Sequence, residues 1–169
     1  MKAPLNYRRI SSRFSNSRLH PVLKIRRPHH GVDYAAAAGT PVMAIGDGVV
    51  QYARWDNKGG GNTVRIKHNS VYSTAYLHVQ KYGPGIKSGV KVKQGQVIGY
   101  VGSTGLSTGP HLDFRFYKNN KAVDPLKVES PPTDPVKDSN LEQFNIERDE
   151  WLDMLNEIEM NTKEESPVI

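Results

Sequence analysis

Polar and apolar residues alternate regularly between residues 111 and 116, directly after a turn marked by Gly109-Pro110. The polar positions are His111, Asp113 and Arg115, and the apolar positions are Leu112, Phe114 and Phe116. Because successive side chains of a β-strand point to opposite faces, this alternation predicts a strand with one face in the core. The other face would carry two metal-binding side chains, two residues apart and pointing the same way.

Shorter runs of the same kind fill the chain up to about residue 128 and are separated by Gly, Pro, Asn and Asp. They predict strands at residues 29–33, 41–45, 49–55, 62–68, 71–79, 90–101 and 122–126. Within residues 71–79 the alternation puts Thr74, Tyr76 and His78 on a polar face. Residues 1–27 are basic and rich in Ser, and we expect a lead-in with short strands there. The predicted fold class is therefore mainly β, as a single domain of antiparallel β-sheet or barrel-like type.

The C-terminal part of the chain has a different pattern. Residues 129–139 are rich in Pro and predict a linker that follows a β domain of residues 28–128. Beyond the linker, apolar residues recur at three- and four-residue steps, which predicts an acidic amphipathic helix over residues 140–160. That helix could dock on the β domain or pair with a partner helix. Residues 161–169 are expected to be a disordered tail.

Composition excludes several classes of protein. The 169 residues contain no run of about 18 apolar residues, so no membrane-spanning segment is predicted. The absence of cysteine excludes disulfides and thiolate ligands to a metal. The chain also starts without the charged-then-apolar pattern of a signal peptide, and we expect none within it.

The net charge of +6 conceals two oppositely charged parts. Residues 1–128 carry 20 Lys and Arg against five acidic residues, a net charge of +15, and residues 129–169 carry three against twelve, a net charge of −9. A basic domain favours an anionic polymer such as nucleic acid, anionic lipid or a cell-wall glycan, although charge can also serve solubility alone. Nucleic acid is disfavoured, because the aromatic residues are not interleaved with the basic ones as base stacking requires. The acidic segment could also fold back over the basic domain.

A second pair of metal-binding side chains lies far upstream of residues 111–116. His29 and Asp33 share one face if this stretch is extended, and Gly31 between them leaves that face open. Together with His111 and Asp113 they would offer three or four nitrogen and oxygen ligands, the donors that zinc prefers. Such short patterns also recur by chance, and a single His is more often a surface or hydrogen-bonded residue.

Seven motifs follow one another along the chain: Pro28–Tyr34, Gly39–Val42, Gly46–Val50, Tyr76–His78, Val92–Gly99, Gly102–Gly105 and Thr108–Phe114. In order and spacing they resemble the LytM/lysostaphin-type zinc metallopeptidases, the M23 family, and look closest to MepM-type murein endopeptidases of Gram-negative bacteria. Ile10–Phe14 and Ala122–Leu126 extend the similarity to about residues 8–128. The resemblance implies a groove-bearing β domain, one zinc ion, hydrolysis of peptide cross-links in peptidoglycan, and a periplasmic or cell-envelope location.

The resemblance also implies roles for individual residues. His29 and Asp33 match two zinc ligands, and His78 and His111 match the two catalytic histidines. The third ligand of the family is a histidine, but this chain has Asp113 at that position. A carboxylate binds zinc at about the same distance as an imidazole, but its negative charge makes the ion a weaker Lewis acid.

Two further side chains share a predicted face with the candidate site residues. Arg115 shares the face of Asp113 and could pair with it, either compensating its charge or occupying the place of the metal. Tyr76 shares the predicted face of His78 and could line the groove, although a plain packing role fits equally well. The site is therefore either a retuned zinc centre or an inactive one.

The second interpretation is a metal-free module of the same fold that binds the cell wall and activates a cell-wall amidase. The helix predicted over residues 140–160 is a candidate contact for such a hydrolase partner. A lipoyl- or biotin-carrier domain is a third interpretation suggested by Val92–Gly99, but no Lys lies in a matching exposed hairpin.

Overall fold

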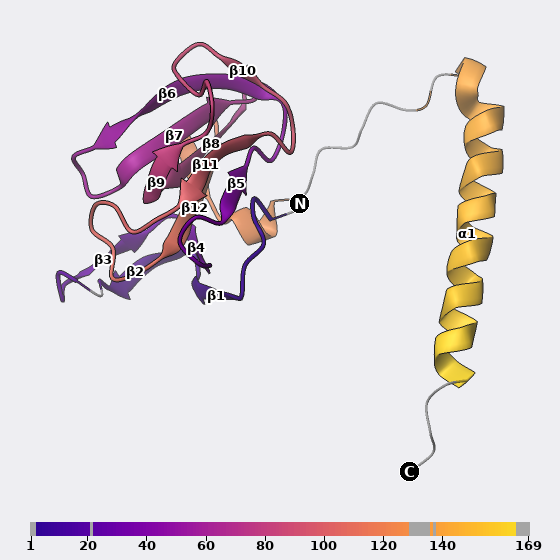
Figure 1. Cartoon of the computed structure of the whole chain (residues 1–169), viewed down its shortest axis with the longest axis horizontal. Coiled ribbons are helices and arrows are strands. Elements are labelled where there is room, and N and C mark those ends of the chain that lie inside the picture. The colour runs from indigo at the N-terminus through magenta and orange to yellow at the C-terminus, as the bar shows by residue number, and fades with distance from the viewer. Residues whose placement is uncertain (1–2, 21, 129–135, 137, 165–169) are drawn as a thin grey trace. The chain divides into compact units, whose positions relative to one another are not determined.

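The computed structural model describes residues 3–20, 22–128, 136 and 138–164. The chain divides into two compact units, one ending at Ser130 and one beginning at Pro131, and the second consists mainly of one long helix (Figure 1). The first unit is built almost entirely from antiparallel strands, which confirms the predicted fold class.

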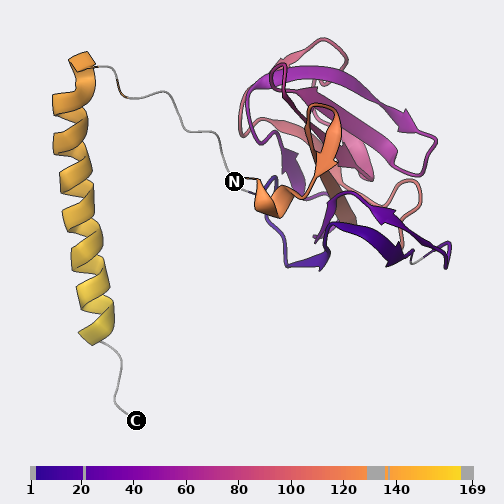
Figure 2. The same ribbon diagram turned by 180° about the vertical axis from the view of Figure 1, so that it is seen from behind.

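The β domain contains three sheets, seen from opposite sides in Figures 1 and 2. Its strands are β1 (Arg9–Ser12), β2 (Ser15–Leu19), β3 (Arg26–His29), β4 (Val32–Ala35), β5 (Pro41–Met43), β6 (Gly48–Asp56), β7 (Gly61–Lys67), β8 (Tyr72–Leu77), β9 (Val79–Tyr82), β10 (Lys91–Val92), β11 (Val97–Val101), β12 (His111–Lys118) and β13 (Lys121–Val123). The largest sheet has the order β1-β4-β12-β8-β7-β6-β10, with β13 paired to β12. β5, β11 and β9 form a second sheet, and β2 and β3 form a separate hairpin.

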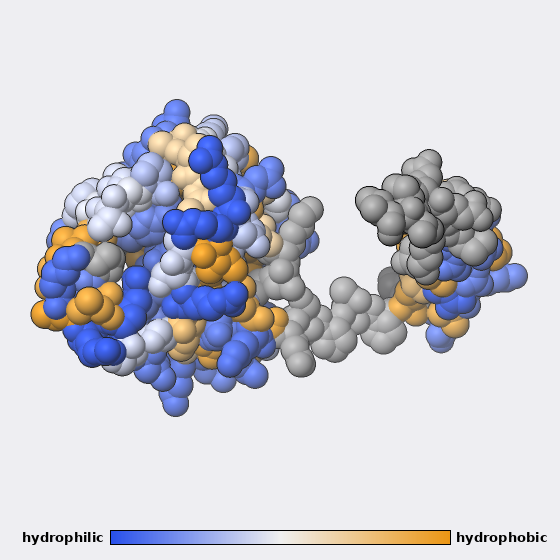
Figure 3. Space-filling view, turned by 90° about the horizontal axis from the view of Figure 1, so that it is seen from below, coloured by the Kyte–Doolittle hydropathy of each residue, from blue (hydrophilic) through white to orange (hydrophobic). Residues whose placement is uncertain are grey.

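The hydrophobic core contains residues from both larger sheets. Leu112, Phe114 and Phe116 of β12 all belong to it and are at most 6% exposed, which confirms the alternation predicted for this strand. Asp113 therefore lies on the opposite face of β12, where it is the direct cross-strand neighbour of Asp33 in β4. Hydrophilic side chains cover most of the face of the β domain that Figure 3 shows, and the apolar residues there form small separate groups.

The stretch 71–79 departs from the prediction. β8 ends at Leu77, and His78 has a φ of 65°, a left-handed conformation that interrupts the strand before β9 begins. Tyr76 faces Phe114 in the core and is 0% exposed, with its hydroxyl accepting a hydrogen bond from the Ile45 N–H at 3.1 Å. Burial raises the pKa of Tyr76 to about 12. Of the two roles open for Tyr76, lining the groove or packing in the core, the structure supports packing, because the ring is buried and the hydroxyl is hydrogen-bonded inside the core.

Residues 29–33, predicted as one strand, belong to two. β3 ends at His29 and β4 begins at Val32, so the chain passes from the hairpin to the large sheet between them. The shared face expected for His29 and Asp33 thus does not come from a single strand. The two side chains meet because the hairpin lies against the large sheet.

The C-terminal unit contains α1 (Leu141–Glu164), preceded by the short 3₁₀ turn η2 (Asp138–Asn140); a further 3₁₀ turn, η1 (Pro125–Lys127), ends the β domain. The helix predicted over residues 140–160 is thus present and includes residues 161–164, which we had expected in the tail. Most of the predicted linker, and residues 165–169, lie outside the described residues. Among the described helices, none combines the length and the apolar character needed to span a membrane. The docking of α1 on the β domain or on a partner stays a prediction.

Candidate active site

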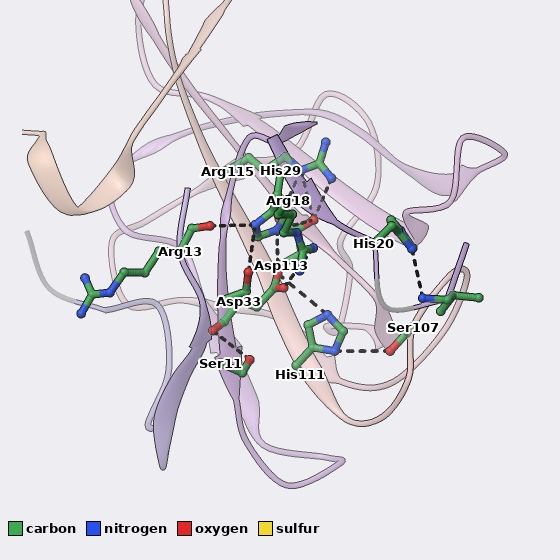
Figure 4. Close-up of polar contacts among 12 residues, drawn as sticks. Ser11, Arg13, Arg18, His20, His29, Asp33, Ser107, His111, Asp113 and Arg115 are labelled. Carbon is green, nitrogen blue, oxygen red and sulfur yellow. Dashed lines mark hydrogen bonds and ion pairs between the residues drawn. The ribbon is translucent and has the colours of Figure 1, made fainter. Parts of the chain in front are cut away.

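Segments from three parts of the β domain meet at a groove of about 620 Å³. His29 is the last residue of β3, Asp33 lies in β4, and His111 and Asp113 lie in β12, with His78 between β8 and β9. These five side chains line the groove, together with Arg115, so the structure brings together six of the seven residues that the sequence singled out. Figure 4 shows His29, Asp33, Asp113 and His111 pointing toward one another.

Three of these side chains lie close enough together to bind one metal ion. One donor atom each from His29, Asp33 and Asp113 lies within 4.8 Å of the other two, and all three residues are buried. The Nε2 atom of His29 is 2.9 Å from Oδ1 of Asp33 and 3.7 Å from Oδ2 of Asp113. Ligand atoms around a tetrahedral zinc ion are about 3.3 Å apart at the usual bond lengths, so these separations suit such an ion.

Two buried atoms of this group lack a conventional partner. His29 Nε2 and Asp33 Oδ1 make no hydrogen bond within the described residues, although they face each other. Buried polar atoms without a partner are costly to a folded protein. The donor set, one imidazole nitrogen and two carboxylates, is a chemistry that binds zinc, so the residues present fit a metal ion.

Backbone carbonyls orient the three histidines. In each ring the Nδ1 atom lies within hydrogen-bond distance of a backbone carbonyl oxygen. The partner is Arg13 for His29 at 3.1 Å, Thr104 for His78 at 2.7 Å and Gly109 for His111 at 2.8 Å. A carbonyl oxygen can only accept, so each Nδ1 must carry the proton and donate it. Each Nε2 is left as the atom that can bind a metal or exchange a proton in the groove.

The electrostatic environment separates the roles of the histidines. Burial alone would lower the pKa of His29, but the carboxylates of Asp113 and Asp33 outweigh burial and raise it to about 9. The two carboxylates therefore strongly favour a positive charge at this point, as the ligands of a cation do. Burial lowers the pKa of His78, so this imidazole is neutral near pH 7 and able to accept a proton. The rings of His78 and His111 are 4.8 Å apart.

Asp113 has a second partner besides the ligand group. Arg115 donates from its terminal nitrogen to Oδ2 of Asp113 at 2.7 Å and from Nε to both carboxylate oxygens at 3.2 Å. Burial opposes ionisation of Asp113, but the charge of Arg115 and the contact with His29 hold its pKa far below the usual range. Asp113 is thus an anion whose oxygens are shared between a guanidinium and the ligand group.

Gly31 keeps the space next to Asp113 open. A Cβ atom at this position would collide with Oδ1 of Asp113 and would lie 2.9 Å from both Cγ of Arg115 and the carbonyl oxygen of Phe114. We expect Gly31→Ala to lower the free energy of unfolding by about 1–3 kcal/mol through overpacking. Urea unfolding measures this loss, and Gly109→Ala is the matched control because a Cβ there meets nothing within 4 Å. Equal stability of the two variants would contradict the close packing around Asp113.

Two groups of residues in the groove were not expected from the sequence. Arg18 of β2 lies 3.5 Å from Oδ2 of Asp33, and Lys58 with the following glycines of the β6–β7 loop lines another wall. The only signal for Arg18 was the absence of acidic residues in the first 32 positions. Nothing in the sequence indicates that the carbonyl of Thr104 orients His78, because any residue can supply a backbone carbonyl.

Comparison with known proteins agrees with this geometry. The sequence profile of Peptidase family M23 matches residues 27–125. Peptidoglycan DD-endopeptidase ShyC of Vibrio cholerae is 44% identical over 144 residues, which are 85% of this chain and 33% of that protein. This chain thus spans about a third of the length of this curated relative.

Solved peptidase structures have a fold similar to that of this β domain. A zinc-containing peptidase from Vibrio cholerae superimposes with a TM-score of 0.69 at 44% identity, covering 76% of this chain and 40% of that one. The catalytic domain of lysostaphin from Staphylococcus simulans superimposes with a TM-score of 0.62 at 38% identity, covering 70% of this chain and 89% of that one.

Proposed function

Because this chain belongs to peptidase family M23, we propose that it is a zinc-dependent endopeptidase that cleaves peptide cross-links of peptidoglycan in the bacterial cell envelope. The observation that carries the proposal is the convergence of His29, Asp33 and Asp113 on one point, beside His78 and His111, which line the same groove. The name of the relative ShyC supports peptidoglycan as the substrate. The cell envelope follows from the substrate, since peptidoglycan is found there.

His29, Asp33 and Asp113 would hold the metal, because they are the buried donors that face one another. A bound zinc ion would polarise the scissile carbonyl and lower the pKa of a water molecule. The two carboxylates reduce this effect by adding negative charge at the ion. Arg115 counteracts them, since its guanidinium withdraws charge from Asp113 at 2.7 Å.

His78 and His111 have different roles in this proposal: His78 transfers protons, and His111 stabilises negative charge. The neutral imidazole of His78 can accept a proton from the attacking water at Nε2, because its Nδ1 proton is committed to the Thr104 carbonyl. Once protonated, the same nitrogen can donate to the departing amine. The ring of His111 lies 4.8 Å from that of His78, and its Nδ1 proton is donated to the Gly109 carbonyl. When Nε2 is protonated as well, His111 can donate a hydrogen bond to the negative oxygen that forms from the scissile carbonyl.

The groove also suits an anionic substrate. Its lining includes the basic side chains Arg9, Arg18, Arg27 and Lys58. The peptides of peptidoglycan carry free carboxylates, which such side chains attract. Binding to the wall is therefore expected to weaken as the salt concentration rises.

One observation favours a second candidate function. The carboxylates of Asp113 and Asp33 already face two guanidinium groups, at 2.7 Å for Arg115 and 3.5 Å for Arg18. The protonated imidazole of His29 is a third cation beside them, so the charge of the two carboxylates is compensated without a metal ion. This compensation suits a metal-free module that binds the cell wall and activates an amidase.

The two functions are separated by one experiment. Purified peptidoglycan is incubated with the protein, either with added zinc or with a chelator, and the soluble fragments are identified by mass spectrometry. We expect cleaved cross-links with zinc and none with the chelator. A folded protein that binds peptidoglycan but releases no fragments under either condition would replace the endopeptidase with the metal-free module.

A further inference from the structure

A second hollow, of about 320 Å³, lies next to the groove and has no role in the proposed chemistry. It is lined by Tyr52 and by Arg54 to Lys58, at the end of β6 and the beginning of the β6–β7 loop. The volume is at the lower end of the range of small-ligand sites, about 300–1,000 Å³. The hollow is therefore large enough to hold a small rigid unit of a larger ligand.

The lining of this hollow combines an aromatic face with polar groups. Trp55 is 53% exposed, although an indole ring is among the side chains that gain most from burial. Tyr52 lies two strand positions before Arg54, whose guanidinium covers the tyrosine ring at 4.8 Å. Asp56, Asn57 and Lys58 add hydrogen-bond acceptors and donors. An exposed aromatic ring surrounded by polar side chains suits a pyranose, which has an apolar C–H face and a rim of hydroxyl groups.

The hollow adjoins the groove and shares two lining residues with it. Asp56 and Lys58 line both, so a ligand that occupies the hollow can reach the groove through these residues. No charged residue of the hollow is needed for the proposed metal site. The proposed substrate contains a peptide for the groove and a sugar for the hollow in one polymer, since each of its peptides is attached to a chain of N-acetylated sugars.

The loop that joins the two regions is held in place. The carboxylate of Asp56 accepts from the backbone N–H groups of Lys58 at 3.0 Å and Gly60 at 3.2 Å. The carbonyl of Gly60 in turn accepts from the backbone N–H of His78 at 2.9 Å, and that of Gly59 accepts from Leu106 at 2.9 Å. A sugar bound at Trp55 would therefore have a fixed position relative to the candidate catalytic residue His78.

From these observations we propose that Tyr52 and Arg54–Lys58 form a glycan subsite, in which Trp55 stacks against an N-acetylhexosamine of the glycan chain that carries the peptide being cleaved. The inference rests on the proposed function for its substrate, but saccharide binding itself requires neither zinc nor cleavage. The subsite would make the protein prefer peptides that are attached to glycan over free cross-linked peptides.

Binding is tested first, without any cleavage. The chain has two tryptophans, so Trp151→Phe leaves Trp55 as the single fluorescent indole. We expect a tetramer of β-1,4-linked N-acetylglucosamine to change the Trp55 fluorescence saturably in the presence of a chelator, and an α-1,4-linked glucose tetramer to leave it unchanged. No response to the first, or the same response to both, would overturn the inference. A response only to a glycan-free cross-linked peptide would assign the surface to peptide and would also overturn it.

Cleavage is tested second, as a ratio of two rates. For Trp55→Ala we expect the rate on intact peptidoglycan, divided by the rate on glycan-free cross-linked peptide, to fall about tenfold, as the loss of a central aromatic contact does. Trp55→Phe should keep most of the ratio, and Trp151→Ala, which removes the other exposed tryptophan, should keep all of it. A ratio that does not change in Trp55→Ala would contradict the subsite. If no variant cleaves either substrate, the proposed function fails, while the fluorescence experiment still decides the saccharide site.

Discussion

Replacing His29 with alanine is expected to lower peptidoglycan cleavage by about a thousandfold, because a metal ion contributes several kcal/mol to the transition state. His29 supplies the only nitrogen of the described ligand group, and its Nε2 is aimed by the bond from Nδ1 to the Arg13 carbonyl. Without it, Asp33 and Asp113 remain as two neighbouring carboxylates and cannot complete a set of three donors. The rate of fragment release from purified peptidoglycan, measured at saturating zinc, gives the effect.

His30 provides a matched control one position away. Its ring stacks on Phe14 at 5.2 Å between ring centres and takes no part in the ligand group. His30→Ala is expected to keep the cleavage rate within a few-fold of the unmodified protein. Equal losses in the two variants would mean that His29 matters for local folding, and the ligand assignment would then be wrong.

Zinc at about a hundred times its dissociation constant is expected to raise the melting temperature of the protein by about 10 °C, and a chelator should reverse the rise. The shift follows from binding to the folded state alone, since the three ligands come from separate strands and are not assembled in the unfolded chain. In Asp113→Ala most of the shift should disappear, because only His29 and Asp33 remain as donors. Differential scanning calorimetry with and without zinc measures both values.

The melting temperature without zinc distinguishes the contact of Asp113 with Arg115 from its expected contact with the metal ion. Asp113→Ala leaves Arg115 without its carboxylate, so the variant should melt lower than the unmodified protein even in the chelator. Asp47→Ala is the control, since it removes an aspartate that pairs with Lys93 at an exposed position and should keep the full zinc shift. A full zinc shift in Asp113→Ala would show that Asp113 serves Arg115 alone. No zinc shift in the unmodified protein would favour the metal-free module.

The strand β12 could be predicted in detail from local pattern. Its period of two separates Leu112, Phe114 and Phe116 from the polar face, and all three of these residues are buried in the core. Asp113 and His111 were therefore assigned to the correct face. For Gly31 the sequence predicted only an open face between His29 and Asp33, whereas the structure places it directly against Asp113 and Arg115 of β12.

The same reasoning failed in β8, because polar character was taken to mean exposure. Thr74 and Tyr76 are both 0% exposed, and their hydroxyl groups bond to each other at 3.2 Å. His68 adds a further partner for Thr74 at 2.9 Å. One of these bonds is within β8 itself, and the other partners, His68 and Ile45, lie outside the strand. The alternation of residues along β8 does not indicate any of them. His78 reaches the groove because its φ of 65° interrupts the strand, a conformation that the alternation did not indicate.

The sequence by itself determined the fold class, the donor atoms available to a metal and the departure at Asp113, since these depend on residue type and short-range period. Only the tertiary structure decided how the donors meet, because β3, β4 and β12 are brought together by contacts between distant segments. It also decided which nitrogen of each histidine faces the groove, through the carbonyls of Arg13, Thr104 and Gly109. Backbone carbonyls are the same in every residue, so their influence on the site depends on where the folded chain places them.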